Sequence, residues 1–175
     1  IGWGLGLATA LLFGGQALAV ATGLASGETA PTGWPWLLVL ATLAAGGDTV
    51  TLGTITGGAG TLGTQPLLVR AVGPSLAAFG VTGALEDPKL EFFTGSTKVG
   101  ENDNWGGSAS LSAVMAQVGA FPFSSTTSRD AAISLPNLAS GGNSAKISGS
   151  GAGTVNIHVQ SLGACAAGME RIAKR

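Results

Sequence analysis

Short strand-like runs, each closed by turn residues, recur along the chain between residues 36 and 160. The longest apolar run is W-L-L-V-L-A-T-L-A at 36–44, and T-V-T-L-G-T-I-T at 49–56 alternates threonine with mostly apolar residues. Such alternation is typical of a strand with one buried face. Further runs cover 66–72, 89–100, 129–135, 144–150 and 154–160. Seven or eight short strands separated by turn signals predict an all-β fold, an antiparallel β-sandwich of jelly-roll-like type.

One segment replaces the strand pattern with helical spacing. Its apolar residues at intervals of three and four are Leu111, Val114, Met115 and Val118. Ser108 precedes them in the position of an N-cap, so residues 108–118 are predicted to form one short helix. A single helical turn is also predicted after Ser75, which could cap it.

Charge is scarce in this chain. Lysine and arginine together number 8 and aspartate and glutamate 9, which gives a net charge of −1. With no basic patch, nucleic-acid binding is not expected. The lone cysteine, Cys165, cannot form an internal disulfide. The lone histidine, His158, lies in V-N-I-H-V, where alternation predicts a surface or interface residue on the polar face of a strand.

Residues 1–33 are nearly uncharged, with Glu28 as their only charged residue. Three interpretations compete: a signal peptide with A-L-A at 17–19 as a cleavage-like site, a membrane helix, and an extended arm that packs into another subunit. A basic start is missing, so we favour the arm, and a helix is weakened by Gly2, Gly4, Gly6, Gly14, Gly15 and Gly23. The predicted assembly residues are Leu5, Leu7, Leu11, Leu12, Phe13, Leu18, Val20 and Leu24.

These patterns predict three parts. Residues 1–33 form a donor-strand-like arm, residues 34–162 form the β-sandwich, and residues 163–175 form a C-terminal tail that holds four charged residues. The proline and glycine residues of T-G-W-P at 32–35 punctuate the chain between the first two parts.

The most polar stretch is E-N-D-N-W-G-G at 101–107. Glu101, Asp103 and Asn104 offer oxygen ligands of the kind that calcium prefers, which makes calcium the one cofactor that the sequence suggests. The other interpretation is a turn held by Asn and Asp side chains, with Trp105 covering the end of the core. We favour the turn, because the spacing lacks the pattern of an EF-hand.

Arg70 stands alone in an apolar run, L-L-V-R-A-V. A charge there has to be exposed or paired, and Asp130 is the predicted partner in a structural pair. No enzymatic activity is predicted, because the one histidine has no surrounding nucleophile motif.

Three stretches carry a resemblance to a known family: L-L-V-R-A-V-G-P-S-L-A-A-F-G-V, E-N-D-N-W-G-G and S-R-D-A-A. In this order they resemble a repeat domain of large secreted and cell-surface proteins of Verrucomicrobia-like bacteria, over roughly residues 34–160. The chain is more distantly similar to pre-peptidase C-terminal domains, which are β-sandwiches of secreted proteins. The resemblance implies an extracellular or cell-surface location, and it implies no catalytic activity.

The expected function is a structural subunit of a pilus-like extracellular filament or surface assembly. Its arm would insert into the sandwich of the next copy, so its partners would be copies of itself, joined head to tail by donor-strand exchange. Two alternatives remain: a carbohydrate- or calcium-binding module that uses Trp34, Trp36 or Trp105, and a membrane-anchored surface protein. A membrane contact is not expected in the mature form.

Overall fold

The computed structural model describes residues 9–13, 19–20, 36–57 and 62–162, with side chains from residue 37 onward. The described elements include ten strands, one α-helix and one 3-10 helix. The first strands are β1 (Thr9–Phe13), β2 (Ala19–Val20), β3 (Trp36–Leu43), β4 (Thr49–Thr56) and β5 (Thr64–Val72). The 3-10 helix η1 (Pro74–Phe79), β6 (Pro88–Thr94), β7 (Thr97–Asn102) and α1 (Ala109–Gln117) follow. The last strands are β8 (Ala131–Ala139), β9 (Gly141–Gly149) and β10 (Gly153–Ser161).

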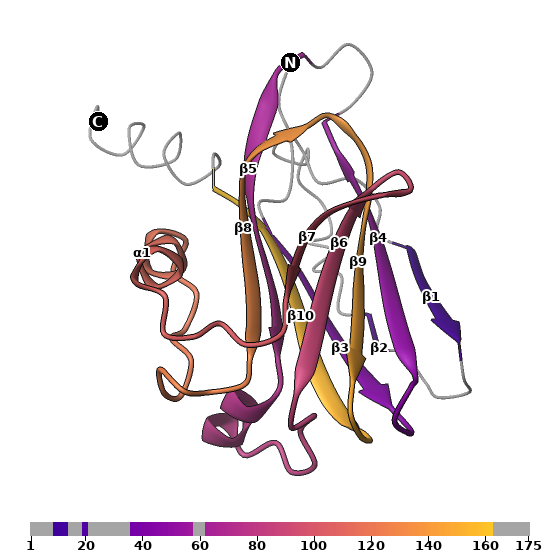
Figure 1. Ribbon diagram of the computed structural model, residues 1–175, viewed down its shortest axis with the longest axis vertical. Coiled ribbons are helices and arrows are strands. Elements are labelled where there is room, and N and C mark those ends of the chain that lie inside the picture. Colours follow the sequence, from indigo (N-terminus) through magenta and orange to yellow (C-terminus); the bar gives the residue numbers. More distant parts are fainter. Residues whose placement is uncertain (1–8, 14–18, 21–35, 58–61, 163–175) are drawn as a thin grey trace, which may run out of the picture.

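The strands form two antiparallel sheets packed face to face (Figure 1). The first sheet has the order β1-β4-β9-β6-β7, and the second has the order β2-β3-β10-β5-β8. From β3 onward the pairs are nested: β3 with β10, β4 with β9, β5 with β8 and β6 with β7. A long hairpin that closes at the β6–β7 turn and is then rolled up gives this nesting, which is the jelly-roll arrangement. The predicted antiparallel β-sandwich is confirmed.

The core lies between the sheets and is built from alternate residues of the strands. Val50 and Leu52 of β4, Leu90 and Phe92 of β6, and Ile157 of β10 are each 1% exposed or less. Their chain neighbours point to the outer faces, because successive side chains of a strand alternate.

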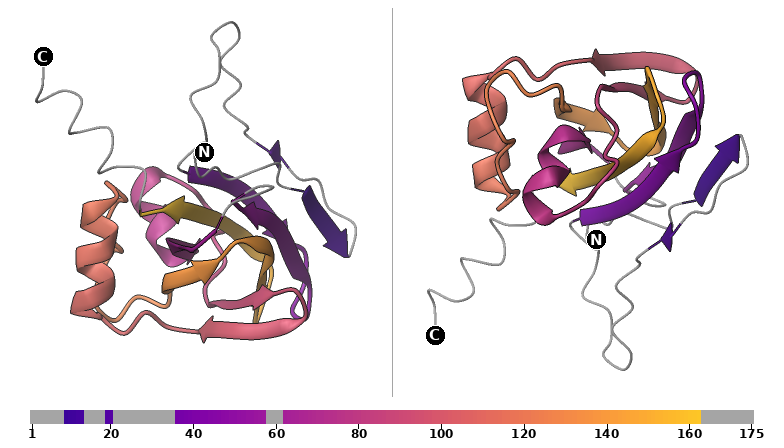
Figure 2. Two further views of the ribbon diagram at one scale, coloured as in Figure 1. Left: turned by 90° about the horizontal axis from the view of Figure 1, so that it is seen from above. Right: turned by 90° about the horizontal axis from the view of Figure 1, so that it is seen from below.

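A second apolar cluster covers the outward face of the second sheet. Leu68 and Val72 of β5 pack there against Met115 of α1 and against Trp105 and Phe123. The predicted helix is confirmed, with Ser108 as its cap accepting a hydrogen bond from Leu111 N–H. In Figures 1 and 2, α1 lies on one side of the sandwich and β1 on the other. Around β5 the second sheet is therefore covered on both faces, while the first sheet is covered on one.

The helical turn after β5 forms, but its predicted cap is wrong. Helix η1 begins at Pro74 with Gly73 at the N-cap, and no side chain caps it. A Cβ on Gly73 would lie 2.0 Å from the carbonyl oxygen of Leu85, so no other residue fits without a shift of the backbone. Ser75 is instead buried and bound to Asp130.

None of the helices in the described part of the chain is long and apolar enough to cross a membrane.

Candidate functional site

Parts of the N-terminal arm add strands to both sheets. β1 pairs antiparallel with β4 over five residues, from Thr9 opposite Gly53 to Phe13 opposite Thr49. β2 pairs with β3 over two residues, with Val20 opposite Val39. Without these strands, β4 and β3 would be edge strands with unpaired backbone groups. The arm therefore closes the same edge of both sheets.

The eight predicted assembly residues fall partly within these strands. Leu11, Leu12 and Phe13 belong to β1, and Val20 belongs to β2. Leu5, Leu7, Leu18 and Leu24 lie outside the described residues, as does Cys165.

The opposite edge of the sandwich is formed by β7 and β8, which are the last strands of the two sheets. At one end the two strands are held together, because Asn102 Oδ1 accepts a hydrogen bond from Ala132 N–H at 3.0 Å. Next to it, a Cβ on Gly100 would lie 3.2 Å from Cγ2 of Ile133, so a glycine lets the strands approach closely. Toward the other end of β7, the strands diverge.

This divergence leaves a cavity of about 520 Å³, here called the edge groove. Its apolar lining comes from Val99, Leu135, Pro136, Leu138 and Ala139, and no charged residue lines it. The edge groove thus lies between the two sheets, at the edge formed by β7 and β8.

A β-bulge interrupts each wall of the edge groove. The pairing of β6 with β7 shifts between Phe92 and Phe93, which leaves Val99 as an extra residue between Lys98 and Gly100. The pairing of β5 with β8 also shifts, so that the segment 136–137 of β8 lies opposite Pro66 alone. Bulges re-aim side chains and bend edge strands. These two irregularities therefore account for the shape of the groove, and sequence periodicity did not reveal them.

The E-N-D-N-W stretch is divided between a strand and a turn. Glu101 ends up in β7, where its carboxylate Oε2 lies 2.5 Å from Lys98 Nζ. This hydrogen bond holds the pKa of Glu101 below, and that of Lys98 above, its ordinary value. Asn102 Nδ2 donates to the carbonyl oxygen of Asn104, the side-chain bond expected of the turn interpretation.

No group of three or more His, Cys, Asp and Glu residues that could hold a metal occurs in the part of the chain that the structure describes. The Glu101 carboxylate already accepts a hydrogen bond from Lys98, whereas Asp103 and Asn104 are exposed beyond the end of the strand. Trp105 is 8% exposed, and its Nε1 donates to the carbonyl oxygen of Ser125. Its ring packs in the outer cluster, so it does not present a platform for a sugar, and it covers that cluster and not the main core.

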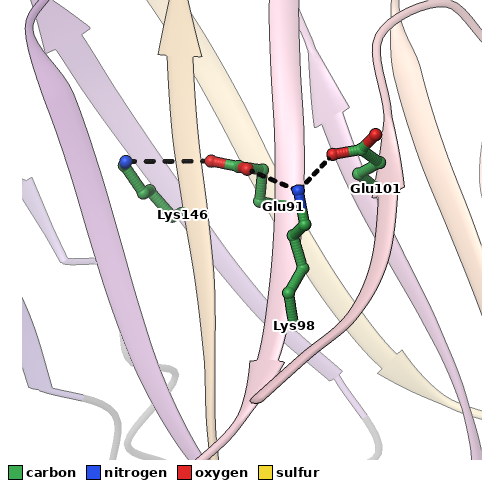
Figure 3. Close-up of polar contacts among 4 residues, drawn as sticks. All are labelled: Glu91, Lys98, Glu101 and Lys146. Atoms are coloured by element: carbon green, nitrogen blue, oxygen red, sulfur yellow. Dashed lines mark hydrogen bonds and ion pairs between the residues drawn. The ribbon is translucent and has the colours of Figure 1, made fainter. Parts of the chain in front are cut away.

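Charged residues form a row across the outward face of the first sheet (Figure 3). Lys146 of β9 is opposite Glu91 of β6, and Glu91 is opposite Glu101 of β7. Glu91 lies 3.7 Å from Lys146 and 3.2 Å from Lys98, which also contacts Glu101. Most of the row is exposed to solvent, so this face of the sheet is hydrated. Ion pairs in such a setting add little to the free energy of unfolding.

Arg70 projects from β5 into the outer cluster and is 0% exposed. Its guanidinium carbon lies 4.5 Å from the ring centres of both Phe121 and Phe123, and Nη2 donates to the carbonyl oxygen of Phe121 at 2.8 Å. Burial lowers the pKa of Arg70 to about 10, although the charge of Asp130 acts in the opposite direction. Two aromatic faces thus take the place of a direct acidic partner.

The predicted structural pair of Arg70 and Asp130 is not a direct contact, because no ion pair joins these two described residues and Asp130 acts on Arg70 through its charge alone. The Asp130 carboxylate accepts hydrogen bonds from the backbone N–H groups of Gly73 and Ser75 at 2.8 and 3.2 Å, and from the hydroxyls of Ser75 and Ser128. Asp130 therefore holds the G-P-S turn after β5, and its influence on Arg70 acts at longer range.

His158 lies directly opposite Arg70 on the neighbouring strand β10. Burial, together with the positive charge of Arg70, lowers the pKa of His158 to about 4. The side chain is half-buried on the outward face of the second sheet, as the alternation indicates. It is therefore neutral at pH 7.

Comparison with models of known protein families, with curated proteins and with solved structures finds no match to this chain. The resemblance to a repeat domain of surface proteins stays a prediction.

Proposed function

We propose that this chain is a non-enzymatic structural subunit of an extracellular filament or surface assembly, joined to its neighbours by its N-terminal arm. The observation that carries the proposal is the addition of β1 to β4 and of β2 to β3, by which the arm acts as a strand on the edges of both sheets. An element that pairs with a sheet edge can join separate copies of a chain.

The chemistry of the arm supports this role. Residues 1–27 contain no Asp, Glu, Lys, Arg or His. An uncharged apolar segment can be buried between subunits without the desolvation cost of an ionised group. If about eight apolar side chains were buried at roughly 1.5–3 kcal/mol each, the joint would be durable.

The polar clusters of the described residues also support a structural role. Asp130 binds the backbone of a turn, and Lys98 binds Glu101 and Glu91 on an exposed face. These contacts hold local structure together, so the proposal requires no cofactor and no substrate. Secretion to the cell surface is part of the proposal and follows from the resemblance of the sandwich sequence.

Electron microscopy of the full chain beside a chain that lacks residues 1–33 tests this function. We expect ordered assemblies from the full chain and dispersed particles from the shortened chain. Circular dichroism and thermal unfolding establish that the shortened chain is folded. Dispersed particles from both chains, over a range of concentrations and salts, would contradict the proposal.

A substitution variant covers the case in which the shortened chain does not fold. Leu11→Asp together with Leu12→Asp keeps the length of the chain and places charge in β1. The matched control is Leu62→Asp, at a leucine that is 89% exposed and lies outside the arm. Loss of assembly in the double variant and normal assembly in the control are the expected results.

A further inference from the structure

The edge groove is an apolar surface on the side of the sandwich that the arm leaves open. Among the described residues, β7 and β8 each pair with a strand on one side only. The cavity between them, about 520 Å³, falls within the usual range for binding sites, roughly 300–1,000 Å³. Val99, the extra residue of the β7 bulge, lines it and is 45% exposed. Such an edge can accept an extended segment between the two sheets.

A segment with the matching pattern stands directly before β1. Residues 1–8 read I-G-W-G-L-G-L-A, so every second residue is a large apolar one and those between are glycine or alanine. In an extended strand this period of two places Ile1, Trp3, Leu5 and Leu7 on one face and almost no side chain on the other. Neither this segment nor the lining of the edge groove contains a charged side chain.

We propose, as a more specific form of the function proposed above and resting on it, that residues 1–8 of one copy dock in the edge groove of the next copy. Their apolar face fills the groove and their backbone pairs with β7. β1 and β2 remain on their own sandwich, where they pair with β4 and β3.

The dimensions and the sheet order fit this arrangement. Eight residues in a strand span about 26 Å, more than the six residues of β7. In the first sheet the order β1-β4-β9-β6-β7 places the donor strand and the open strand at opposite edges. A contact between opposite edges is heterologous, so it continues from copy to copy and forms a filament unless it closes into a ring.

The residues at the groove favour β7 over β8 as the pairing edge. Pro136 removes one backbone N–H from β8, which makes that strand a poorer partner. Lys98 of β7 is held on the outward face of the sheet by Glu91 and Glu101, so its charge is directed away from the groove. The backbone of β7 can therefore receive a strand.

Crosslinking between separately labelled full-length chains tests the proposal. In a Cys165→Ser background, one chain carries Leu5→Cys and the other carries Val99→Cys, and a short bismaleimide joins thiols that lie close together. We expect crosslinked pairs of chains, and far fewer when Ile55→Cys replaces Val99→Cys. Ile55 is a matched control because it is 50% exposed and lies on β4, away from the groove. Equal crosslinking to both positions would overturn the proposal.

A second position in the edge groove gives an independent crosslinking test, in case the substitution at Val99 itself prevents docking. Ala139→Cys lies on the β8 wall and is exposed, so we expect it to crosslink to Leu5→Cys as well. For assembly itself, Val99→Lys should abolish filaments, whereas Ile55→Lys should leave them intact. Filaments from the Val99→Lys chain would contradict docking in the groove.

A locked chain separates failure of this proposal from failure of the function. Leu11 and Thr51 are direct partners in the β1–β4 pairing. Cysteines at both positions of one Cys165→Ser chain can therefore form a disulfide, which holds β1 on the β4 of its own chain. We expect the oxidised chain to assemble as the reduced chain does. If only the reduced chain assembles, the arm joins subunits by exchanging β1, and the groove proposal fails while the function stands. If assembly never depends on the arm, both fail.

Discussion

The outward faces of the two sheets carry different kinds of side chains. On the first sheet, charged residues such as Lys146 and Glu91 form an exposed row. On the second, Leu68, Arg70 and Val72 of β5 are buried beneath α1 and the segment 118–123. The difference is already visible in the two strands: β6 alternates in K-L-E-F, while β5 is apolar on both faces in L-L-V-R-A-V except at Arg70.

The comparison teaches how the setting of a charge decides its role. Lys98 and Glu101 meet in water, where their hydrogen bond contributes little to stability. Arg70 is fully buried and is held by two aromatic rings and a carbonyl oxygen. A charge on the covered face is therefore part of the packing, whereas charges on the open face serve solubility. Four measurements can break or sharpen this contrast.

The largest effect is expected from Asp130→Ala. Asp130 is fully buried and accepts hydrogen bonds from two backbone N–H groups and two hydroxyls, all of which would lose this acceptor. We expect the free energy of unfolding, measured with urea, to fall by about 3–5 kcal/mol. Asp103→Ala, at an exposed aspartate, is the control and should stay within about 0.5 kcal/mol of the parent chain. A small change at Asp130 would mean that the turn after β5 does not depend on it.

Arg70→Ala should come next, with a loss of about 3 kcal/mol, because it removes the stem and the cation between Phe121 and Phe123. Arg70→Met keeps most of the volume without a buried charge and should lose less than half of that. The same urea titration on Lys146→Ala, on the open face, should show almost no change. Equal losses for Arg70→Ala and Lys146→Ala would erase the contrast between the faces.

His158 should make the covered face sensitive to acid. Its pKa is about 4 in the folded chain and about 6.5 when unfolded, so below pH 6.5 the unfolded chain takes up the proton first. The free energy of unfolding should therefore fall by roughly 2 kcal/mol between pH 7.5 and pH 5, and this contribution is fully lost once the pH is below 4. A His158→Gln chain should lack this component. If both chains show the same dependence between pH 7.5 and pH 5, His158 is not its source.

The smallest effect is expected from Lys98→Ala, which removes two ion pairs of the exposed row. The midpoint of thermal unfolding should shift only slightly at low salt, and the shift should vanish in high salt because exposed charges are screened. A large shift that persists in high salt would show that the row stabilises the fold.

The strands and the helix could be predicted from the sequence because their signals are local. The run at 49–56 is β4 residue for residue, and Ser108 caps α1 as its position indicates. The alternation in K-L-E-F likewise placed Glu91 on the outer face. Period and capping involve neighbours in the chain, so no knowledge of the fold is needed to see them.

The partners of buried polar groups could not be predicted in this way. Asp130 was expected to bind Arg70, yet it binds the turn at Gly73 and Ser75, 55 to 57 residues away in the chain. The aromatic rings around Arg70 come from a loop, 121–123, that has no periodic pattern. The edge groove depends on two bulges, and a bulge is a mismatch between paired strands, which one strand alone does not reveal.

The most direct test of the central claim, that residues 1–8 build an assembly by adding a strand to a neighbour, is electron microscopy of the full chain beside a chain without these residues. This shorter deletion leaves β1 and β2 in place, so the fold of the sandwich is preserved. We expect filaments from the full chain and single particles from the shortened one. Filaments of the same form from both chains would contradict the claim.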